Sequence, residues 1–525
     1  MHTFQPILDA AREDGFILRL EGDGARLEGS VIVRGKPVPL ILRFEDFTLA
    51  EAPRAFLTDI SMLGRKVIPH VDDALELCIV DRSIFVFDRE KAPELVRGLV
   101  ARAAEVLERG MTKAGTDEIA EEFPFYWSST YIPDPASVGD TDRAAAITEP
   151  ANITEVTTAS RLSFEAHQAK PETWGEFIEW AAYWDPGLGD RLTNALARLS
   201  TKNRTVVIRA PNAAIAVGVT VPAASPKSQG AFDKGAGGRR LLRTPAARAF
   251  KIERLRVRAI DLVAILGANG VDGIPPLSGK KIVVVGCGAI GGYLARMLVQ
   301  MGAGIGGGRL NLIDADRLDV MNIRRHQLGR EAHARHKVAA CAELLGRDFP
   351  GVVVKPFVGE AHQNPSLLVD ADLVIDATGE QAFSEWLNAW WIGRARAGEA
   401  RPDLLFCWVA GAGAAVQSFM MTNATGDEFA CYRCLQPDLR ERGRFDPLKE
   451  APADPVQPCG EAAFTPYGPA APTIAAGLAV SHAGDWALGH PHPLMRTVRI
   501  DWEATVKRDP KSPDRARNCP ACIAA

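Results

Sequence analysis

Two pairs of cysteines near the end of the chain have the spacing of metal ligands. Nine cysteines occur among the 525 residues, and four of them form Cys431-x-x-Cys434 and Cys519-x-x-Cys522. Each pair can present two thiolates on one turn, and four thiolates complete a closed tetrahedral zinc site. We therefore expect a structural Zn²⁺ that holds the end of the chain to its domain. Unrelated thiols or a redox pair are the alternative.

Cys459 has the surroundings of a nucleophile. It lies in the Pro- and Gly-rich segment PVQPCGEAAFTPYGP, which precedes a helix of small residues. An exposed thiol on a loop beside a helix meets the requirements of a nucleophilic cysteine. A spare loop thiol is the alternative.

Cys78 allows two interpretations. It follows Pro69-His70-Val71-Asp72 and precedes the strand-like IVDRSIFVF. If it is a nucleophile, Asp73, His70 or backbone N–H groups must stabilise the oxyanion that forms during acyl transfer. The apolar residues around it fit a buried strand equally well, where free cysteines are common. The other three cysteines, Cys287, Cys341 and Cys407, are expected to be structural.

A glycine-rich loop follows a predicted buried strand. The segment KIVVVGCGAIGG places Gly286, Gly288 and Gly291 between a run of Val and Ile and an amphipathic helix. Backbone N–H groups and a helix N-terminus then face a phosphate. Asp314 closes the next strand, where a carboxylate can accept hydrogen bonds from ribose hydroxyls. This much predicts a Rossmann-like nucleotide-binding unit.

The polar residues after Asp314 narrow the ligand. Asp316, Asn322 and Arg325 follow within one segment, together with Arg324 and His326, and Lys337 begins the next predicted helix. Cations and an amide beside a phosphate loop suit a nucleoside triphosphate, which carries more charge than a dinucleotide pyrophosphate. We therefore expect ATP.

This order of residues resembles the ThiF/MoeB/E1 family, whose members adenylate the C-terminal carboxylate of ubiquitin-like proteins. The resemblance covers the last half of the chain. It implies that Asp314 holds the ribose and that Asn322, Arg325 and Lys337 hold the triphosphate, with Arg325 and Lys337 stabilising charge during adenylation. It also implies that Cys459 takes the activated acyl group and that the two C-x-x-C pairs bind zinc.

The family's D-x-T-D-N segment is altered here. It appears as Asp376-Ala377-Thr378-Gly379-Glu380, so glycine replaces an aspartate that usually binds Mg²⁺. The resemblance implies Mg²⁺ bound by Asp376 or Glu380. The resemblance also implies a homodimer in which an arginine of one subunit reaches into the ATP site of the other. The candidates are Arg254, Arg256 and Arg258, which lie on a predicted helix before the glycine loop.

The first part of the chain is similar to a ubiquitin-conjugating (E2) fold. A short helix, the meander FILRLEGDG, ARLEGSVIVRG and KPVPLILRFEDF, an irregular segment bearing Cys78 and a helix over residues 91–109 follow the order of that fold. The N-x-x-R-H-x-L form from Asn322 to Leu328 is also more like bacterial E1 domains fused to an E2-like domain. Cys78 would then be the thioester-forming thiol of the E2.

Three regions are expected: an E2-like α+β domain over residues 1–125, a connecting domain and linker over 126–250, and a Rossmann-like α/β adenylation domain over 251–525. Lys and Arg (61) nearly balance Asp and Glu (65), which argues against nucleic-acid or membrane partners. The chain begins without a signal-peptide pattern, so a cytoplasmic protein is expected.

The resemblance implies a ligase of the kind found in CBASS antiphage operons. Its partners would be the C-terminus of a ubiquitin-like protein or of a cGAS-like cyclase (CD-NTase), a conjugation target and a JAB-family deconjugating protease. A sulfur-carrier adenylyltransferase without E2 activity, an NAD-dependent oxidoreductase and a non-catalytic scaffold are the alternatives. The oxidoreductase has no use for Asn322, Arg325 and Lys337 around the phosphates.

Overall fold

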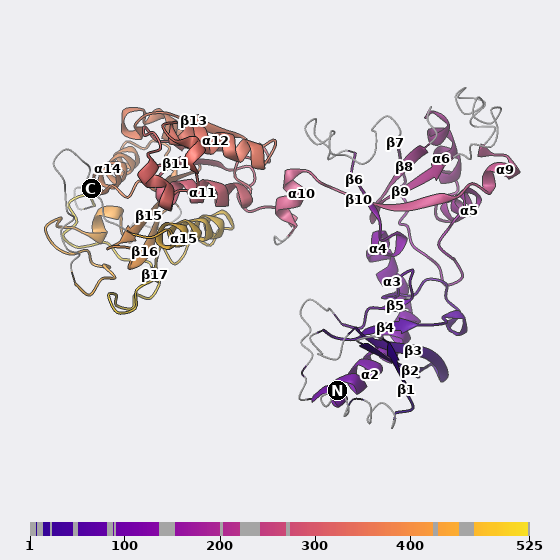
Figure 1. The fold of residues 1–525 in the computed structure, drawn as a ribbon. Coiled ribbons are helices and arrows are strands. Elements are labelled where there is room, and N and C mark those ends of the chain that lie inside the picture. Colours follow the sequence, from indigo (N-terminus) through magenta and orange to yellow (C-terminus); the bar gives the residue numbers. More distant parts are fainter. Residues whose placement is uncertain are drawn as a thin grey trace. The chain divides into compact units, whose positions relative to one another are not determined.

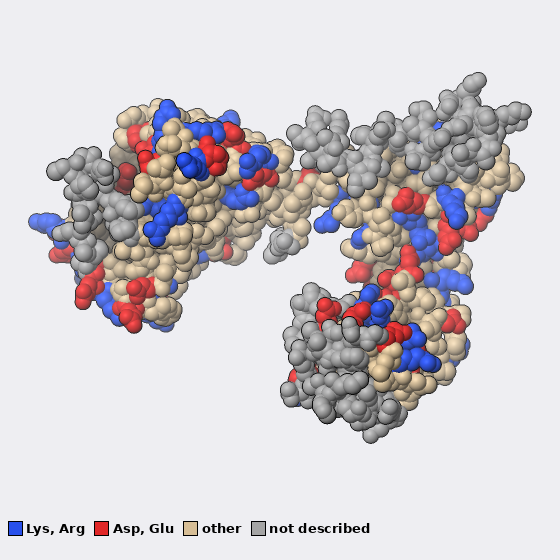
Figure 2. Space-filling model, in the orientation of Figure 1, with Lys and Arg blue, Asp and Glu red and all other residues tan. Residues whose placement is uncertain are grey.

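The computed structural model describes residues 7, 14–21, 24–45, 51–80, 88, 91–135, 153–199, 203–220, 242–268, 273–423, 429–450 and 467–522. The chain forms two compact units, Met1–Ala259 and Ile260–Ala525 (Figure 1). The first unit contains both the expected E2-like region and the expected connecting region. Acidic and basic side chains are interspersed on the visible face of each unit, as the balanced composition leads us to expect (Figure 2).

An antiparallel meander and one long helix form the first part of the N-terminal unit. The strands, in sheet order, are β1 (Ile17–Glu21), β2 (Gly24–Val33), β3 (Lys36–Phe44), β4 (Arg54–Leu57) and β5 (Glu76–Leu77). Along β2 the apolar Ala25, Leu27, Val31 and Val33 are buried, because alternate residues of a strand face the same side. Helix α2 (Ala92–Gly110) packs on β2 through residues spaced three or four apart. The expected meander and helix are therefore present.

A second sheet follows in the same unit. Its order is β6 (Tyr131–Pro133), β10 (Ile252–Arg258), β9 (Ala213–Thr220), β8 (Asn203–Ala210) and β7 (Ile153–Thr157). The helices of this part are α3 (Lys113–Glu121), α4 (Phe123–Trp127), α5 (Trp174–Trp184), α6 (Leu188–Ala197) and α9 (Pro245–Arg248). Thr173 and Glu176 form a capping box that begins α5. The buried rings of Phe123, Trp127 and Trp180 join the helices into one core.

The expected helix with three arginines before the glycine loop is wrong. Arg254, Arg256 and Arg258 lie on strand β10, which pairs with β9 and β6. From Arg254 to Arg258 arginines alternate with Leu255 and Val257, and this period of two favours a strand. Arg254 donates to the carbonyl oxygens of Trp127 and Pro171, so it is tied into the N-terminal unit.

The C-terminal unit is a doubly wound α/β domain. Its sheet has the order β13 (Val354–Phe357), β12 (Arg309–Ile313), β11 (Lys281–Val285), β14 (Leu373–Asp376), β15 (Asp403–Ala410), β16 (Ala415–Met421) and β17 (Met495–Arg499). The strands from β13 to β15 are parallel, and β16 and β17 are antiparallel. The chain leaves β11 toward β12 and later returns to the other side of β11 as β14. The strand order therefore reverses there, which is where such sheets bind ligands.

The helices of this unit are α10 (Leu262–Gly267), α11 (Ala289–Gln300), α12 (Lys337–Asp348), α13 (Ser366–Val369), α14 (Gln381–Arg396) and α15 (Ala470–Ala487). Helix α11 packs against α15 and α12, and α15 also packs on β15 and β16 (Figure 1). The predicted Rossmann-like fold is confirmed. Among the described residues, no helix combines the length and the apolarity needed to cross a membrane.

Candidate functional site

The glycine loop lies between β11 and α11, and its glycines have different physical reasons. A Cβ on Gly291 would come within 1.8 Å of the carbonyl oxygen of Gly286, so only glycine lets the helix approach the loop. Gly286 and Gly288 instead line a cavity of about 390 Å³ at the carboxyl ends of β11, β12 and β14. Gly291 supports the loop from behind and does not line the cavity.

Asp314 ties the glycine loop to the end of β12. Its carboxylate accepts hydrogen bonds from the N–H groups of Cys287 and Asp316, each at 2.7 Å. Asp314 and Asp316 both line the cavity. Lys337, only 8% exposed, reaches it from the first turn of α12, and its Nζ lies 2.7 Å from Oδ2 of Asp316. Lys337 thus meets Asp314 and Asp316, which lie more than 20 positions earlier in the chain, around one space.

Carboxylates outnumber cations around this cavity. Asp314, Asp316, Glu360 and Glu380 line it together with the single lysine Lys337. A triphosphate entering this space would be repelled unless a cation shared the charge, and oxygen donors suit Mg²⁺. The donor set therefore fits a magnesium nucleotide.

Asp376 and Glu380 lie differently with respect to the cavity. The Asp376 carboxylate is 2% exposed and accepts hydrogen bonds from Thr378 and Ser384, and burial raises its pKa. Glu380 lines the cavity itself. Gly379 between them has a φ of 72°, a left-handed conformation that glycine adopts without strain. Of the two expected magnesium ligands, Glu380 is the accessible one.

Asn322 and Arg325 do not line this cavity. They belong to the 3₁₀ segment Val320–Arg325, in which Asn322 caps the segment with Asp319. The Arg325 guanidinium lies 5.3 Å from the centre of the Tyr467 ring. The structure therefore brings together Asp314, Asp316 and Lys337 but leaves Asn322 and Arg325 apart from them.

Trp386 is a cavity residue that sequence reasoning missed. The helical spacing of Trp386, Trp390 and Trp391 on α14 by itself indicates packing, and Trp386 does stack with Trp390. It also lines the cavity, together with Phe383 and His362. An aromatic wall suits a nucleobase, because its π-face can stack on the base. Helical spacing alone gave no signal that this face of the helix meets a cavity.

Four cysteines meet in the C-terminal unit. The sulfur atoms of Cys431, Cys434, Cys519 and Cys522 all lie within 4.8 Å of one another, and all four residues are buried. Four ligands at a Zn–S distance of about 2.3 Å in a tetrahedron are separated by about 3.8 Å. The sulfur–sulfur separations run from 3.2 Å (Cys522 to Cys431) and 3.4 Å (Cys434 to Cys522) to 3.8 Å (Cys431 to both Cys434 and Cys519), close to this geometry. The cluster can therefore bind zinc.

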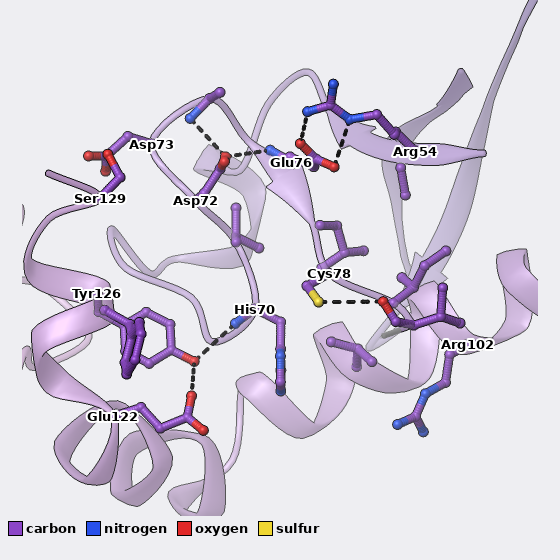
Figure 3. A pocket seen from close by; sticks show the side chains of 18 of the residues that line it. Arg54, His70, Asp72, Asp73, Glu76, Cys78, Arg102, Glu122, Tyr126 and Ser129 are labelled. Carbon is purple, nitrogen blue, oxygen red and sulfur yellow. Dashed lines mark hydrogen bonds and ion pairs between the residues drawn. The ribbon is translucent and has the colours of Figure 1, made fainter. Parts of the chain in front are cut away.

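Cys78 is exposed in the N-terminal unit. It follows β5 and lines a cavity of about 950 Å³, which Figure 3 shows from close by. The buried-strand interpretation is therefore wrong. His70, Asp72 and Asp73 line the same cavity, and so do Tyr126 of α4 and Lys170, which lies beyond residue 133 in the chain. Cys459, the other expected nucleophile, lies outside the described residues.

The remaining cysteines are buried, as expected. Cys287, Cys341 and Cys407 all lie in the core of the C-terminal unit, and burial raises the pKa of the Cys407 thiol. A thiol that stays protonated is a poor nucleophile. Among the cysteines that the structure describes, only Cys78 is exposed.

Comparison with known proteins agrees with the division of the chain into two units. Residues 262–521 match the ThiF family, and residues 12–133 match prokaryotic E2 family B. An ATP-dependent ubiquitin transferase-like protein Cap2 from Pseudomonas aeruginosa is 28% identical, covering 98% of both chains. A protein of the same name from Escherichia coli is 32% identical, over 43% of this chain and 38% of that one. E. coli MccB with ATP aligns over 47% of this chain and 68% of that one, at 16% identity and a TM-score of 0.35.

Proposed function

Because the chain joins a ThiF-family domain to a prokaryotic E2 family B domain and is thus an E1–E2 type enzyme, we propose that it activates a protein C-terminus with ATP and conjugates it to an amine. The observation that carries the proposal is the exposed Cys78 thiol in its own cavity, on the same polypeptide as the nucleotide cavity. An adenylating enzyme alone has no use for that thiol.

The first step is adenylation of a carboxylate. A carboxylate oxygen attacks the α-phosphorus of ATP, the bond to the β-phosphate oxygen breaks, and pyrophosphate leaves. In this step Asp314 binds the ribose hydroxyls, Trp386 stacks on the base and Lys337 stabilises charge on the phosphates. Glu380 and Asp316 would hold Mg²⁺, which would supply charge neutralisation when bound. The triphosphate roles of Asn322 and Arg325 rest on the family resemblance alone.

Two thiol transfers follow. The Cys459 thiolate attacks the acyl adenylate and releases AMP, and Cys78 then takes the acyl group as a second thioester. An amine of the target attacks this thioester, and the product is an amide or isopeptide bond. The exposure of Cys78 supports its place in this sequence, since a thiol that exchanges protein acyl groups must be reachable.

The substrate is a protein with a free C-terminus, either a ubiquitin-like protein or a cyclase of antiphage defence. The name of the P. aeruginosa relative, a ubiquitin transferase-like protein, supports a ubiquitin-like protein as the substrate. The CBASS setting, the JAB-family protease, the homodimer and a cytoplasmic location belong to the same proposal through the family resemblance. Zinc in the four-cysteine cluster completes it, with a structural role.

A sulfur-carrier adenylyltransferase without E2 activity is the second candidate. The ThiF match over residues 262–521 would suit it equally well. The match of residues 12–133 to an E2 family favours the fusion enzyme, because sulfur-carrier activation needs no second thiol.

The order of the two thiols tests the proposal. Full-length protein, ATP and each candidate substrate with a free C-terminus are incubated and resolved on paired gels with and without thiol. Thiols cleave thioesters but not amides. Cys459→Ala should form neither thioester while still exchanging pyrophosphate. Cys78→Ala should stall with the acyl group on Cys459 and give no conjugate. Conjugation by Cys78→Ala at the wild-type level would favour the sulfur-carrier enzyme.

A further inference from the structure

The backbone of His70 is fixed directly beside Cys78. Its φ is 62°, in the left-handed region that few non-glycine residues adopt. Its carbonyl oxygen accepts the N–H of Cys78 at 2.8 Å, and its own N–H donates to the phenolic oxygen of Tyr126 at 3.3 Å. Backbone strain of this kind persists only where the surroundings hold it. The backbone of His70 is therefore held next to Cys78 by two hydrogen bonds.

The His70 ring is oriented by a carboxylate. Nε2 lies 2.6 Å from Oε1 of Glu118 on α3, a side chain that is only 15% exposed. An ionised carboxylate only accepts hydrogen bonds, so in the neutral imidazole Nε2 carries the proton and Nδ1 keeps its lone pair. Among the described residues, no hydrogen-bond partner of Nδ1 is recorded. A carboxylate that holds an imidazole in one tautomer leaves the other nitrogen ready to accept a proton.

His70 lies on the wall of the Cys78 cavity. Its side chain is 35% exposed, and both residues line the same space of about 950 Å³. In the view of Figure 3 the His70 ring lies between the Cys78 thiol and the Tyr126 phenol. The imidazole and the Cys78 thiol therefore border the same space.

The other acids of this segment are already engaged. Asp73 forms ion pairs with Lys170 and with Arg254, so its carboxylate oxygens already have partners. Oδ1 of Asp72 accepts the backbone N–H groups of Ala74 and Glu76, each at 2.8 Å, which holds the turn before Cys78. These contacts assign Asp72 and Asp73 to the loop's structure and leave His70 for proton transfer.

Several charged or titratable groups face His70 or its cavity. They come from α2 (Arg102 and Arg109), α3 (Glu118), α4 (Glu122 and Tyr126), the turn before β5 (Asp72 and Asp73), β4 with β5 (the Arg54–Glu76 ion pair) and the segment that carries Lys170. Arg109 lies 3.6 Å from the second oxygen of Glu118, while the first oxygen contacts the His70 ring. The carboxylate therefore keeps its contact with the ring.

We propose that His70, oriented by Glu118, is the catalytic base that takes the proton of the amine attacking the Cys78 thioester. The proposal rests on the E2-like function of Cys78. The amine nitrogen forms a bond to the thioester carbonyl carbon, and its extra proton passes to Nδ1 of His70. The C–S bond then breaks with its electron pair on the Cys78 sulfur. The proton on His70 passes to that thiolate or to water, which restores the base.

The test loads Cys78 with an acyl group without using the adenylation reaction. The full-length protein is incubated, in the absence of ATP, with a short synthetic peptide that ends in a glycine thioester. Mass spectrometry then identifies the cysteine that carries the adduct. The loaded protein is then mixed with a large excess of trifluoroethylamine, a weakly basic amine, and each rate is divided by the fraction of that amine that is unprotonated at the pH used. Loss of the adduct gives the rate of aminolysis. The Cys78→Ala variant reports how much label the other thiols take up.

His70→Gln should load normally but discharge about 100-fold more slowly, the usual scale of general-base catalysis. In the wild type the rate should rise between about pH 5.5 and 8, where imidazoles lose their proton. This rise should vanish in His70→Gln. Glu118→Gln keeps an acceptor for Nε2 but removes the carboxylate that orients the ring. Its discharge rate should therefore lie between those of the wild type and His70→Gln.

Tyr126→Phe is the control for distortion of the loop. It removes the phenol that accepts the His70 N–H but leaves the ring and Glu118 in place. It can change the rate, yet the rise with pH should stay where it is in the wild type. Thermal unfolding curves accompany each variant, to show that it is folded.

Each outcome has one meaning. If Cys78→Ala takes up as much label as the wild type, Cys78 is not an acceptor thiol, and both this proposal and the E2-like function are overturned. If Cys78 loads and folded His70→Gln discharges it at the wild-type rate with an unchanged pH profile, only the proposal for His70 is overturned.

Discussion

Nε2 of His326 lies 2.7 Å from the carbonyl oxygen of Cys287 in the glycine loop. The N–H of Leu328 donates to Nδ1 at 3.0 Å, so Nδ1 carries a lone pair and Nε2 must be the donor to Cys287. Burial lowers the pKa of His326, which keeps the ring neutral. His326 is thus a clamp that joins the segment after β12 to the loop after β11.

We expect His326→Ala to weaken ATP binding. Without the imidazole, the loop loses one hydrogen bond and a buried carbonyl oxygen loses its partner, at a cost of about 1–3 kcal/mol. The KM for ATP in pyrophosphate exchange should rise by roughly 5- to 150-fold, with a smaller change in kcat. His326→Gln can still donate to Cys287 and is the matched control. Equal KM values for the wild type and His326→Ala would contradict the clamp.

Lys337→Ala should slow adenylation. The ammonium group is buried beside the cavity, and losing a charged contact to the triphosphate costs about 2–4 kcal/mol of transition-state stabilisation, or roughly 30- to 1000-fold in rate. Lys281→Ala is the control. This lysine also forms an ion pair with an aspartate, but it is the first residue of β11 and so lies at the end of that strand opposite the cavity. ATP–pyrophosphate exchange measures both variants. A wild-type rate in Lys337→Ala would exclude the assigned role.

Trp386→Leu should raise the KM for ATP without unfolding the protein. Stacking of a base on an aromatic ring contributes about 1–3 kcal/mol, so an increase of roughly tenfold is expected. Trp390→Leu is the comparison, because Trp390 lies one turn further along α14, stacks on Trp386 and does not line the cavity. If both variants raise the KM equally, the effect comes from the packing of the helix.

One zinc ion per chain should be bound by the four-cysteine cluster. Cys519→Ser removes one of the four ligands. Because metal binding contributes to folding, this variant should lower the melting temperature of the C-terminal unit, while the fraction that remains folded keeps its activity. Cys78→Ala, which removes a thiol outside the cluster, should retain both zinc and melting temperature. Metal analysis by mass spectrometry checks the stoichiometry. Folded, active protein without zinc would refute the site.

His482 predicts a loss of stability in acid. Its ring is fully buried between Ser418 and the carbonyl oxygen of Pro491, and burial lowers its pKa to about 4. The unfolded chain binds a proton near pH 6.5 and the folded chain only near 4. Stability should therefore fall as the pH drops through this window, by about 3 kcal/mol in total. Chemical denaturation of the wild type and His482→Gln at several pH values measures this slope, which the variant should lack.

The sequence by itself determined the elements that have local signatures. The Val and Ile run before Gly286 predicts a buried parallel strand, and the spacing of Cys431, Cys434, Cys519 and Cys522 predicts a thiolate cluster. Both depend on residues close in sequence or on a spacing with one chemical meaning. The segment with Arg254 was misassigned to a helix, although the five residues from Arg254 to Arg258 alternate between arginine and an apolar side chain.

Only the tertiary structure decided which distant side chains meet. It placed Trp386 and Glu380 on the wall of the nucleotide cavity, whereas Asn322 and Arg325 are not part of that wall. It also exposed Cys78 and set His70 against Glu118, which lie 48 positions apart in the chain. The physical reason is that such contacts arise from the crossing of strands and helices whose packing is governed by the whole core. No local pattern of hydrophobicity or spacing records that packing.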